Sequence, residues 1–193
     1  SVPSSADPVS AALGFALEEL VDRVARSTDV APVVIIDGRS GSGKTTLANA
    51  LRARWPLPAG ADVLSLDSIY PGWDGLRAGS EYLESHVLTP RREGRRATWR
   101  RWDWSADRRA EAHDVDPDRG LIVEGAGALT GRTAPGSSVR VWIESPADSR
   151  RDRALRRDGD AYRPHWERWA RQEDAHVDAE RPRDLASVVI DVP

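Results

Sequence analysis

The chain has 193 residues, of which 39% are hydrophobic and 31% are charged, and its formal net charge is -3. These values are typical of a single globular domain over residues 1–193 and give no general reason to bind nucleic acid or an anionic membrane. Cysteine is absent, which excludes disulfides, thiolate metal ligands and cysteine nucleophiles. The four histidines lack metal-ligand spacing, so no zinc site is predicted.

The first predicted element is an amphipathic helix over residues 9–26, within an N-terminal region of about 30 residues. Its apolar stretch, residues 11–17, stops at Glu18 and has no cationic leader, so it is not predicted to be a secretory signal. The chain contains no run of about 18 apolar residues, and we therefore expect no membrane span. The expected compartment is the cytoplasm.

A strand, a glycine-rich loop and a helix are predicted in succession at residues 33–36, 38–45 and 45–52. The loop matches G-x-x-x-x-G-K-[ST], the phosphate-binding P-loop, although a chance glycine turn is the alternative. Its N–H groups and the helix N-terminus would bind the phosphates, Lys44 would reach the β- and γ-phosphates, and Thr45 would hold Mg²⁺. The predicted nucleotide-binding residues of this loop are Gly38, Ser40, Gly41, Ser42, Gly43, Lys44, Thr45 and Thr46.

Lys44 is the only lysine among the 28 Lys and Arg residues. The excess of arginine is typical of codon bias in a GC-rich genome. Under such a bias, a remaining lysine is expected where the planar guanidinium of arginine cannot replace a compact charge. A tight phosphate site is such a place.

Further strands are predicted at residues 61–66, 121–123, 139–143 and 187–190, with loops at 71–79 and 131–137. Helical patterns between several of these strands predict a parallel α/β sheet, in which ligands bind at the carboxyl ends of the strands. Three carboxylates lie at the carboxyl ends of predicted strands: Asp37, Asp67 and Glu124.

Asp67 could orient an attacking hydroxyl or accept its proton, or it could cap a helix. Glu124 could bind Mg²⁺ through water. Asp37 could act in the site or stabilise its loop.

Arginines are concentrated in residues 91–109 and 150–171, with eight in each segment. They could bind nucleic acid, cover solvated helix faces, or neutralise triphosphate charge. For residues 91–101 we favour solvated helix faces, with binding of an acceptor phosphate as the second interpretation. For Arg153, Arg157 and Arg163 we favour phosphate binding.

Eight of the aromatic residues are tryptophans. On the C-terminal helix, four residues at spacings of three and four favour a packing stripe over a ligand site. These are Trp166, Trp169, Glu173 and His176.

Several motifs resemble the uridine kinase and phosphoribulokinase family of P-loop kinases. Asp67-Ser68-Ile69-Tyr70 is similar to the family's D-S-F-Y, whose Asp is catalytic, and Trp73-Asp74 is similar to F-D, whose Asp holds ribose hydroxyls. Segments 115–125 and 148–158 are similar to V-x-P…I-V-E-G and to the arginine-rich helix that enters the lid.

The resemblance covers most of residues 33–163. It implies a P-loop NTPase fold, a five-stranded parallel sheet ordered 2-3-1-4-5 with helices on both faces, an acceptor region at about 67–110 and a mobile lid at about 150–165.

The resemblance also implies roles for individual residues. The expected catalytic residues are Lys44, Asp67, Arg157 and Arg163, with Arg153 as a further nucleotide ligand. The expected acceptor ligands are Asp67, Tyr70, Trp73, Asp74, Trp102 and Asp103, and the expected Mg²⁺ ligands are Thr45 and Glu124. In the acceptor half, the family's aromatic-Asp-aromatic segment appears as Trp102-Asp103-Trp104. This half departs from the family at Asp107, which stands where uridine kinases have a base-contacting histidine. In the lid, residues 159–163 replace the family's R-G-R.

The leading hypothesis is an ATP- and Mg²⁺-dependent kinase of a small hydroxyl compound. A nucleoside or nucleoside-like acceptor is favoured, and a sugar, a vitamin precursor or an antibiotic stays open as the alternative. The sequence also leaves open whether the donor is ATP or GTP, and whether the protein is a monomer or a homodimer. The N-K-x-D motif of GTPases and the L-S-G-G-Q motif of ABC-type ATPases are absent. A nucleic-acid-associated ATPase is the rival, and the negative net charge counts against it.

Overall fold

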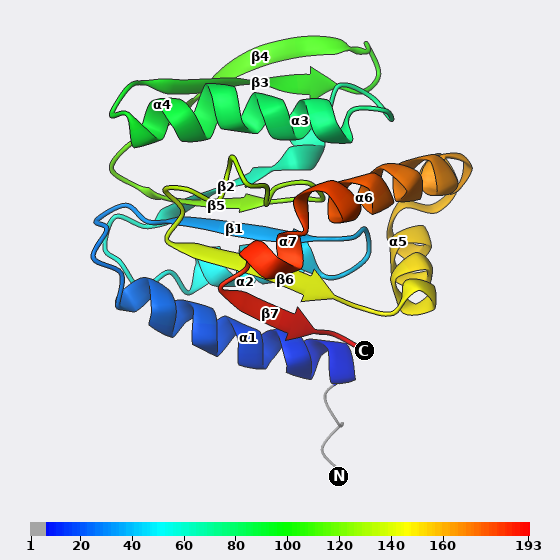
Figure 1. The fold of residues 1–193 in the computed structure, drawn as a ribbon, viewed down its shortest axis with the longest axis horizontal. Helices are drawn as coiled ribbons and strands as arrows, with labels where there is room; N and C mark the ends of the chain where they lie inside the picture. Colours follow the sequence, from blue (N-terminus) through cyan, green and yellow to red (C-terminus); the bar gives the residue numbers. More distant parts are fainter. Residues whose placement is uncertain (1–6) are drawn as a thin grey trace.

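Five parallel strands form the central sheet of the protein, for which a computed structural model describes residues 7–193 (Figure 1). They are β1 (Val33–Gly38), β2 (Ala61–Ser65), β5 (Gly120–Glu124), β6 (Val139–Glu144) and β7 (Val188–Asp191), ordered β2-β5-β1-β6-β7. Counted along the chain, this order is 2-3-1-4-5, as predicted. Residues 1–6 of the predicted N-terminal region lie outside the described residues.

Strand β1 is buried on both faces because its β-branched side chains alternate between two cores. Val33 and Ile35 face a cluster that includes α3 (Leu76–Leu83) and α6 (Trp166–Glu180). Val34 and Ile36 face a cluster with α1 (Pro8–Ala25) and α2 (Lys44–Ala53). Each fully buried Val or Ile contributes about 1.5–3 kcal/mol. The predicted helices on both faces of the sheet are therefore confirmed.

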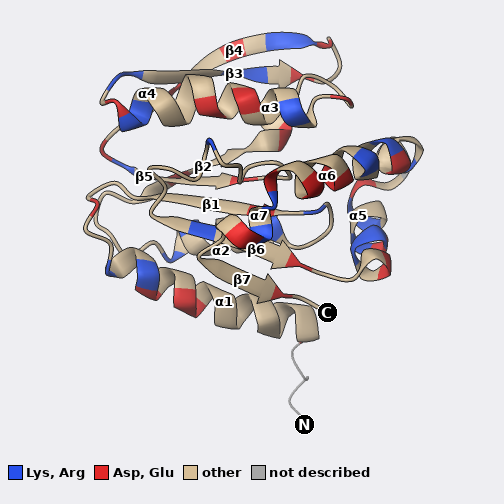
Figure 2. Ribbon diagram, in the orientation of Figure 1, with Lys and Arg blue, Asp and Glu red and all other residues tan. Residues whose placement is uncertain are grey.

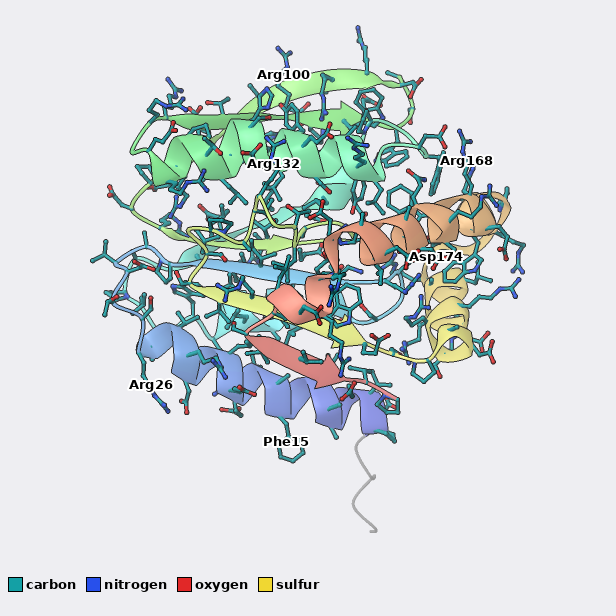
Figure 3. The ribbon with its side chains drawn as sticks, viewed as in Figure 1. Phe15, Arg26, Arg100, Arg132, Arg168 and Asp174 are labelled. Atoms are coloured by element: carbon teal, nitrogen blue, oxygen red, sulfur yellow. The ribbon has the colours of Figure 1, made fainter. Side chains whose placement is uncertain are left out.

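Helix α1 agrees with the predicted helix to within a residue at each end. It packs Leu13, Leu20 and Val24 against the sheet, while Phe15 points outward on the opposite side (Figure 3). In the described part of the chain, no helix is both long and apolar enough to cross a membrane.

A second layer, built from residues 76–115, corrects two predictions. The predicted loop at 71–79 is wrong from Leu76 onward, because helix α3 begins there and buries Leu76 and Leu83. The π-turn η2 (Glu84–Leu88) and α4 (Thr89–Arg92) continue it. The predicted loop at 131–137 is confirmed, since it contains no helix or strand.

Of residues 91–101, only Arg91 and Arg92 are helical, at the end of α4, so the prediction of a helix face is wrong for the rest, although residues 92–96 and Arg100 are exposed to solvent as expected. The segment includes the start of β3 (Ala97–Asp103), which pairs antiparallel with β4 (Arg108–Val115). Ion pairs of Arg96 with Asp114 and of Arg101 with Glu111 connect the two arms of this hairpin, which carries both basic and acidic residues (Figure 2).

The predicted lid lies beyond the carboxyl ends of the strands, where α5 (Ala147–Tyr162) and the turn η3 (Arg163–His165) lead into α6 (Figure 1). Gly159 interrupts α5 with a left-handed backbone, φ 57°, which L side chains rarely adopt. The last turn of α5 is therefore set at an angle to the rest. Helix α7 (Pro182–Leu185) then leads into β7.

Candidate active site

The P-loop joins β1 to α2 in a conformation that requires glycine. Gly41 has φ 78°, and a Cβ there would collide with the backbone of Arg150. Gly43 has φ 102° and caps α2. The side chain of Lys44 is 8% exposed, and its Nζ donates to the carbonyl of Arg39 at 3.0 Å. The lysine is thus folded over the loop, where a bound phosphate would meet it.

Arginines of α5 support the loop through its carbonyl oxygens. Arg150 Nη1 donates to Ser40 O at 3.2 Å, and Arg153 Nε donates to Gly41 O at 2.8 Å. Arg153 also donates to Pro193 O. The predicted phosphate ligand Arg153 is therefore held against the loop backbone in this conformation.

Thr45 and Glu124 form the polar floor of the site. Thr45 Oγ1 donates to Glu124 Oε2 at 3.2 Å, and Glu124 is 2% exposed. Its other oxygen, Oε1, is buried without a hydrogen-bond partner. A cavity of about 30 Å³ lies here and is lined by Lys44, Thr45, Asp67 and Glu124, among others.

These residues fit Mg²⁺, because an unpartnered buried carboxylate oxygen is costly and because Mg²⁺ binds one or two protein oxygens while keeping several waters. Within residues 7–193, no group of three or more His, Asp or Glu side chains is arranged to hold a metal by itself. Phosphate oxygens and water would therefore complete the coordination.

Asp67 lies in the short turn η1 (Leu66–Ser68) that follows β2, and its side chain opens into the cavity. It is inside this turn, whose N-cap is Ser65, so the helix-cap alternative is not observed. The residue is exposed within the cavity, but the protein that surrounds it removes part of the hydration of its carboxyl group and raises its pKa, and the charge of Glu124 raises it further. Lys44 and Arg157 oppose this rise.

A cavity of about 510 Å³ adjoins the P-loop, and five of its twelve lining residues are aromatic. Trp73 is one of its lining residues and is stacked on His165 at 4.2 Å and on Tyr162 at 5.5 Å between ring centroids. Trp169 packs edge-on against Tyr70 at 4.7 Å. The lining residues are Ser40, Thr45, Ser65, Asp67, Tyr70, Trp73, Trp104, Arg157, Asp158, Ala161, Tyr162 and Trp169.

Only the last residue of the Trp102–Trp104 segment lines this cavity. Trp104 is 40% exposed, and its Nε1 donates to the carbonyl of Asp67 at 3.0 Å. Trp102 lies under the guanidinium of Arg109, 5.3 Å from its ring centroid. Asp103 accepts the N–H groups of Ser105 and Ala106 in the hairpin turn. The structure therefore places Trp102 and Asp103 in the hairpin, outside the cavity wall.

Three other predicted site residues do not line this cavity. Asp74 is exposed and forms an ion pair with Arg168 of α6, which is labelled in Figure 3. This hydrogen-bonded pair lowers the pKa of Asp74. Arg163 is exposed in η3, and Thr46 is exposed in the first turn of α2.

Arg157 and Tyr70 do line the cavity. Arg157 donates to the neighbouring Asp158 at 2.9 and 2.6 Å, and this hydrogen bonding raises the pKa of the arginine. The hydroxyl of Tyr70 is buried and donates to Ala126 O at 2.6 Å. Burial raises the pKa of Tyr70 well above its ordinary value, so it stays neutral.

The predicted packing stripe of α6 is buried, as expected. Two of its members also reach the P-loop strand and loop: Glu173 accepts two hydrogen bonds from Ser40, and His176 pairs with Asp37. Trp169, Glu173 and the lid residue Tyr162 were absent from the predicted site. The available signal was a glutamate and a histidine on an otherwise apolar helix face.

The sheet order, the P-loop and the helices α5 and α6 beyond the strand ends define a P-loop kinase-like fold. No protein-family model and no curated protein matches the chain. Solved structures share the fold, among them the two that follow.

A possible uridine kinase from Bacillus stearothermophilus aligns over 94% of this chain and 98% of its own, with a TM-score of 0.66 and 20% identity. A candidate fructose transport system kinase from Silicibacter sp. TM1040 aligns over 92% of this chain and 98% of its own, with a TM-score of 0.55 and 20% identity. The predicted fold and its resemblance to uridine kinases are confirmed at the level of the fold.

Proposed function

We propose that the protein is an ATP- and Mg²⁺-dependent kinase that phosphorylates a hydroxyl group of a small molecule. One observation carries the proposal: Asp67 lies where two cavities meet. The smaller cavity contains the P-loop groups Lys44 and Thr45 together with Glu124, and the larger is the aromatic cavity. A triphosphate on the P-loop and a hydroxyl compound between the aromatic rings would thus both reach this carboxylate. A cytoplasmic location, where Mg²⁺ and ATP are available, is part of the proposal.

In the proposed reaction, Lys44 binds the β- and γ-phosphates and Arg157 neutralises charge on the transferred group. Thr45 and Glu124 would hold Mg²⁺, which supplies charge neutralisation at the phosphates when it is bound. The acceptor oxygen forms a bond to the γ-phosphorus as the bond to the bridging oxygen of ADP breaks. Asp67 accepts the hydroxyl proton, and its raised pKa makes it a stronger base than an exposed aspartate.

The aromatic walls favour an acceptor with a flat face. Trp73 and Trp104 can stack on such a face, while Asp67 orients the hydroxyl. A nucleoside or nucleoside-like compound is therefore the first choice, and a sugar, vitamin precursor or antibiotic the second. The two structural neighbours are described as a nucleoside kinase and a sugar-transport kinase, which supports testing both classes. Asp74 could hold a ribose diol only if its ion pair with Arg168 opened.

The proposal is tested by incubating the protein with Mg-ATP or Mg-GTP and panels of nucleosides, sugars, vitamins and aminoglycosides. ADP or GDP release is followed, with Lys44→Ala as the blank. Acceptor-dependent release, together with a phosphorylated product seen by mass spectrometry, is the expected result. Release that is stimulated by RNA and by no small acceptor would replace the proposal with the nucleic-acid-associated ATPase.

A further inference from the structure

Ser40 of the P-loop is hydrogen-bonded to both α5 and α6. Its N–H and its hydroxyl each donate to Oε1 of Glu173 at 2.7 Å. The same hydroxyl oxygen accepts the phenolic hydrogen of Tyr162 at 2.8 Å. Its carbonyl accepts Nη1 of Arg150 at 3.2 Å. Every polar atom of Ser40 therefore has a partner on α5 or α6.

Glu173 is 2% exposed on the buried face of α6. A carboxylate in that position is costly unless donors satisfy it, and Ser40 supplies two. A second contact adjoins this one: Arg39, the neighbour of Ser40 in the P-loop, forms an ion pair with Asp174, the neighbour of Glu173 on α6, which is labelled in Figure 3. Helix α6 thus fixes two consecutive residues of the phosphate-binding loop.

Tyr162 connects the same serine to the aromatic cavity. Its ring is buried and stacks on Trp73, with 5.5 Å between centroids and 16° between planes. Burial is the main cause that raises the pKa of Tyr162, which therefore remains a hydrogen-bond donor at neutral pH. Gly159 lies three residues earlier, and rotation about its unusual backbone would move Tyr162 relative to the P-loop.

We propose that Ser40 links the acceptor cavity to the nucleotide loop. Glu173 is a positioning residue that fixes Ser40, and Tyr162 makes nucleotide affinity depend on the packing of Trp73, so that an acceptor and a nucleotide strengthen each other's binding. The coupling is reciprocal, so nucleotide binding also changes the environment of Trp73. This inference rests on the proposed function for the identity of the two ligands.

The first test labels the protein with 5-fluorotryptophan and follows the ¹⁹F resonance of Trp73, assigned with Trp73→Phe, as Mg-AMPPNP is added. In the wild type, we expect this resonance to shift on saturation. In Tyr162→Phe, which keeps the ring and loses the donor, we expect at least half of the shift to disappear and nucleotide affinity to fall about fivefold. Tyr82→Phe is the control, because Tyr82 contacts the hairpin at Arg100 and does not line the cavity.

The second test is a thermodynamic cycle on nucleotide affinity. Glu173→Gln is expected to weaken Mg-AMPPNP binding about tenfold, since it removes a charged hydrogen-bond acceptor, while Glu167→Gln, an exposed residue on the same helix, has no effect. Tyr162→Phe should cost nothing in a Ser40→Ala background, because the shared hydroxyl is gone.

Additive effects in this cycle, or a Trp73 shift in Tyr162→Phe equal to that of the wild type, would overturn the coupling. Thermal unfolding of each variant checks that it is folded. A wild type that binds no Mg-nucleotide would instead overturn the proposed function.

Discussion

His176 Nε2 lies 2.9 Å from Oδ2 of Asp37, and both side chains are buried. The carboxylate of Asp37 also accepts backbone N–H groups from Gly38, Gly127 and Leu129. It therefore ties together the start of the P-loop, the segment after β5, and α6. Of the two roles left open for Asp37 by the sequence, these four hydrogen bonds support loop stabilisation.

The first prediction concerns the pH dependence of this pair. Burial lowers the pKa of His176, but the hydrogen bond and charge of Asp37, together with Glu180 and Glu173, outweigh burial and the pKa is raised. The folded protein therefore keeps a proton that the unfolded chain releases above about pH 6.5. The stabilisation is complete below that pH and is lost as pH rises through the folded-state pKa.

We expect His176→Gln to lower the free energy of unfolding by about 2–3 kcal/mol at pH 6, with a smaller loss at pH 9. Urea denaturation of both proteins across this range measures the difference. A loss that is the same at every pH would show that folding does not shift the pKa of His176, and a loss that grows with pH would show that His176 is neutral in the folded protein.

The sequence was most informative where neighbouring residues determine the structure. The β-branched run of β1 and the spacing of Gly38, Gly43 and Lys44 are local patterns, and they predicted the strand, loop and helix correctly. The sheet order came from a resemblance in the order of motifs, which reflects how parallel strands are connected. The local patterns depend on short stretches of chain, and the sheet order depends on the order of those stretches along the chain. Neither prediction requires knowledge of side-chain contacts.

The acceptor side depends on contacts between distant residues. Asp74 pairs with Arg168, and Tyr162 bonds Ser40; the partners are separated by 94 and 122 positions. Spacing along the chain carries no signal for such contacts.

The hairpin posed a different difficulty, because the placement of Trp102 and Trp104 relative to the cavity depends on where β3 ends. An arginine-rich segment gave no period-2 apolar pattern that would predict a strand.

The second prediction is that Lys44→Arg fails to restore activity. The lysine is buried and folded against the loop carbonyl of Arg39, so a larger, planar guanidinium would have to occupy a position that holds a compact charge. We expect phosphoryl transfer to fall at least about a hundredfold, in line with loss of a preorganised charge. Steady-state kinetics measure this, with Arg52→Lys, an exposed position on the same helix, as the control. Activity within a few-fold of the wild type would show that any cation suffices at position 44.

The third prediction separates two tryptophans of the hairpin. Trp104 lines the cavity and Trp102 does not, so Trp104→Ala should raise the acceptor KM about tenfold, as expected for loss of one stacking partner. Trp102→Ala should change protein stability more than KM, because its ring packs under Arg109. Nucleotide affinity should be unchanged in Trp102→Ala. A larger KM effect for Trp102→Ala would reverse the assignment and return Trp102 to the acceptor site.

The fourth prediction is that Asp67 gains its catalytic role at the expense of stability. Desolvation and then the charge of Glu124 raise its pKa, so the folded protein binds this proton more tightly than the unfolded chain does. Ionised Asp67 therefore destabilises the fold. This destabilisation grows as the pH rises from the pKa of Asp67 in the unfolded chain to its pKa in the folded protein. We expect Asp67→Asn to raise the Tm at pH 7.5 and to give no increase at a pH below about 3.9.

The same substitution removes the proton acceptor, so kcat should fall about 10²–10⁴-fold while Mg-nucleotide affinity is kept. In the wild type, the acid limb of the kcat profile should lie at higher pH than an exposed aspartate would give. Asp62→Asn is the control, because Asp62 is an exposed partner of Arg119 on the preceding strand and should change neither Tm nor kcat appreciably. A lower Tm for Asp67→Asn at pH 7.5 would show that this carboxylate stabilises the fold, and unchanged kcat would remove it from the proton transfer.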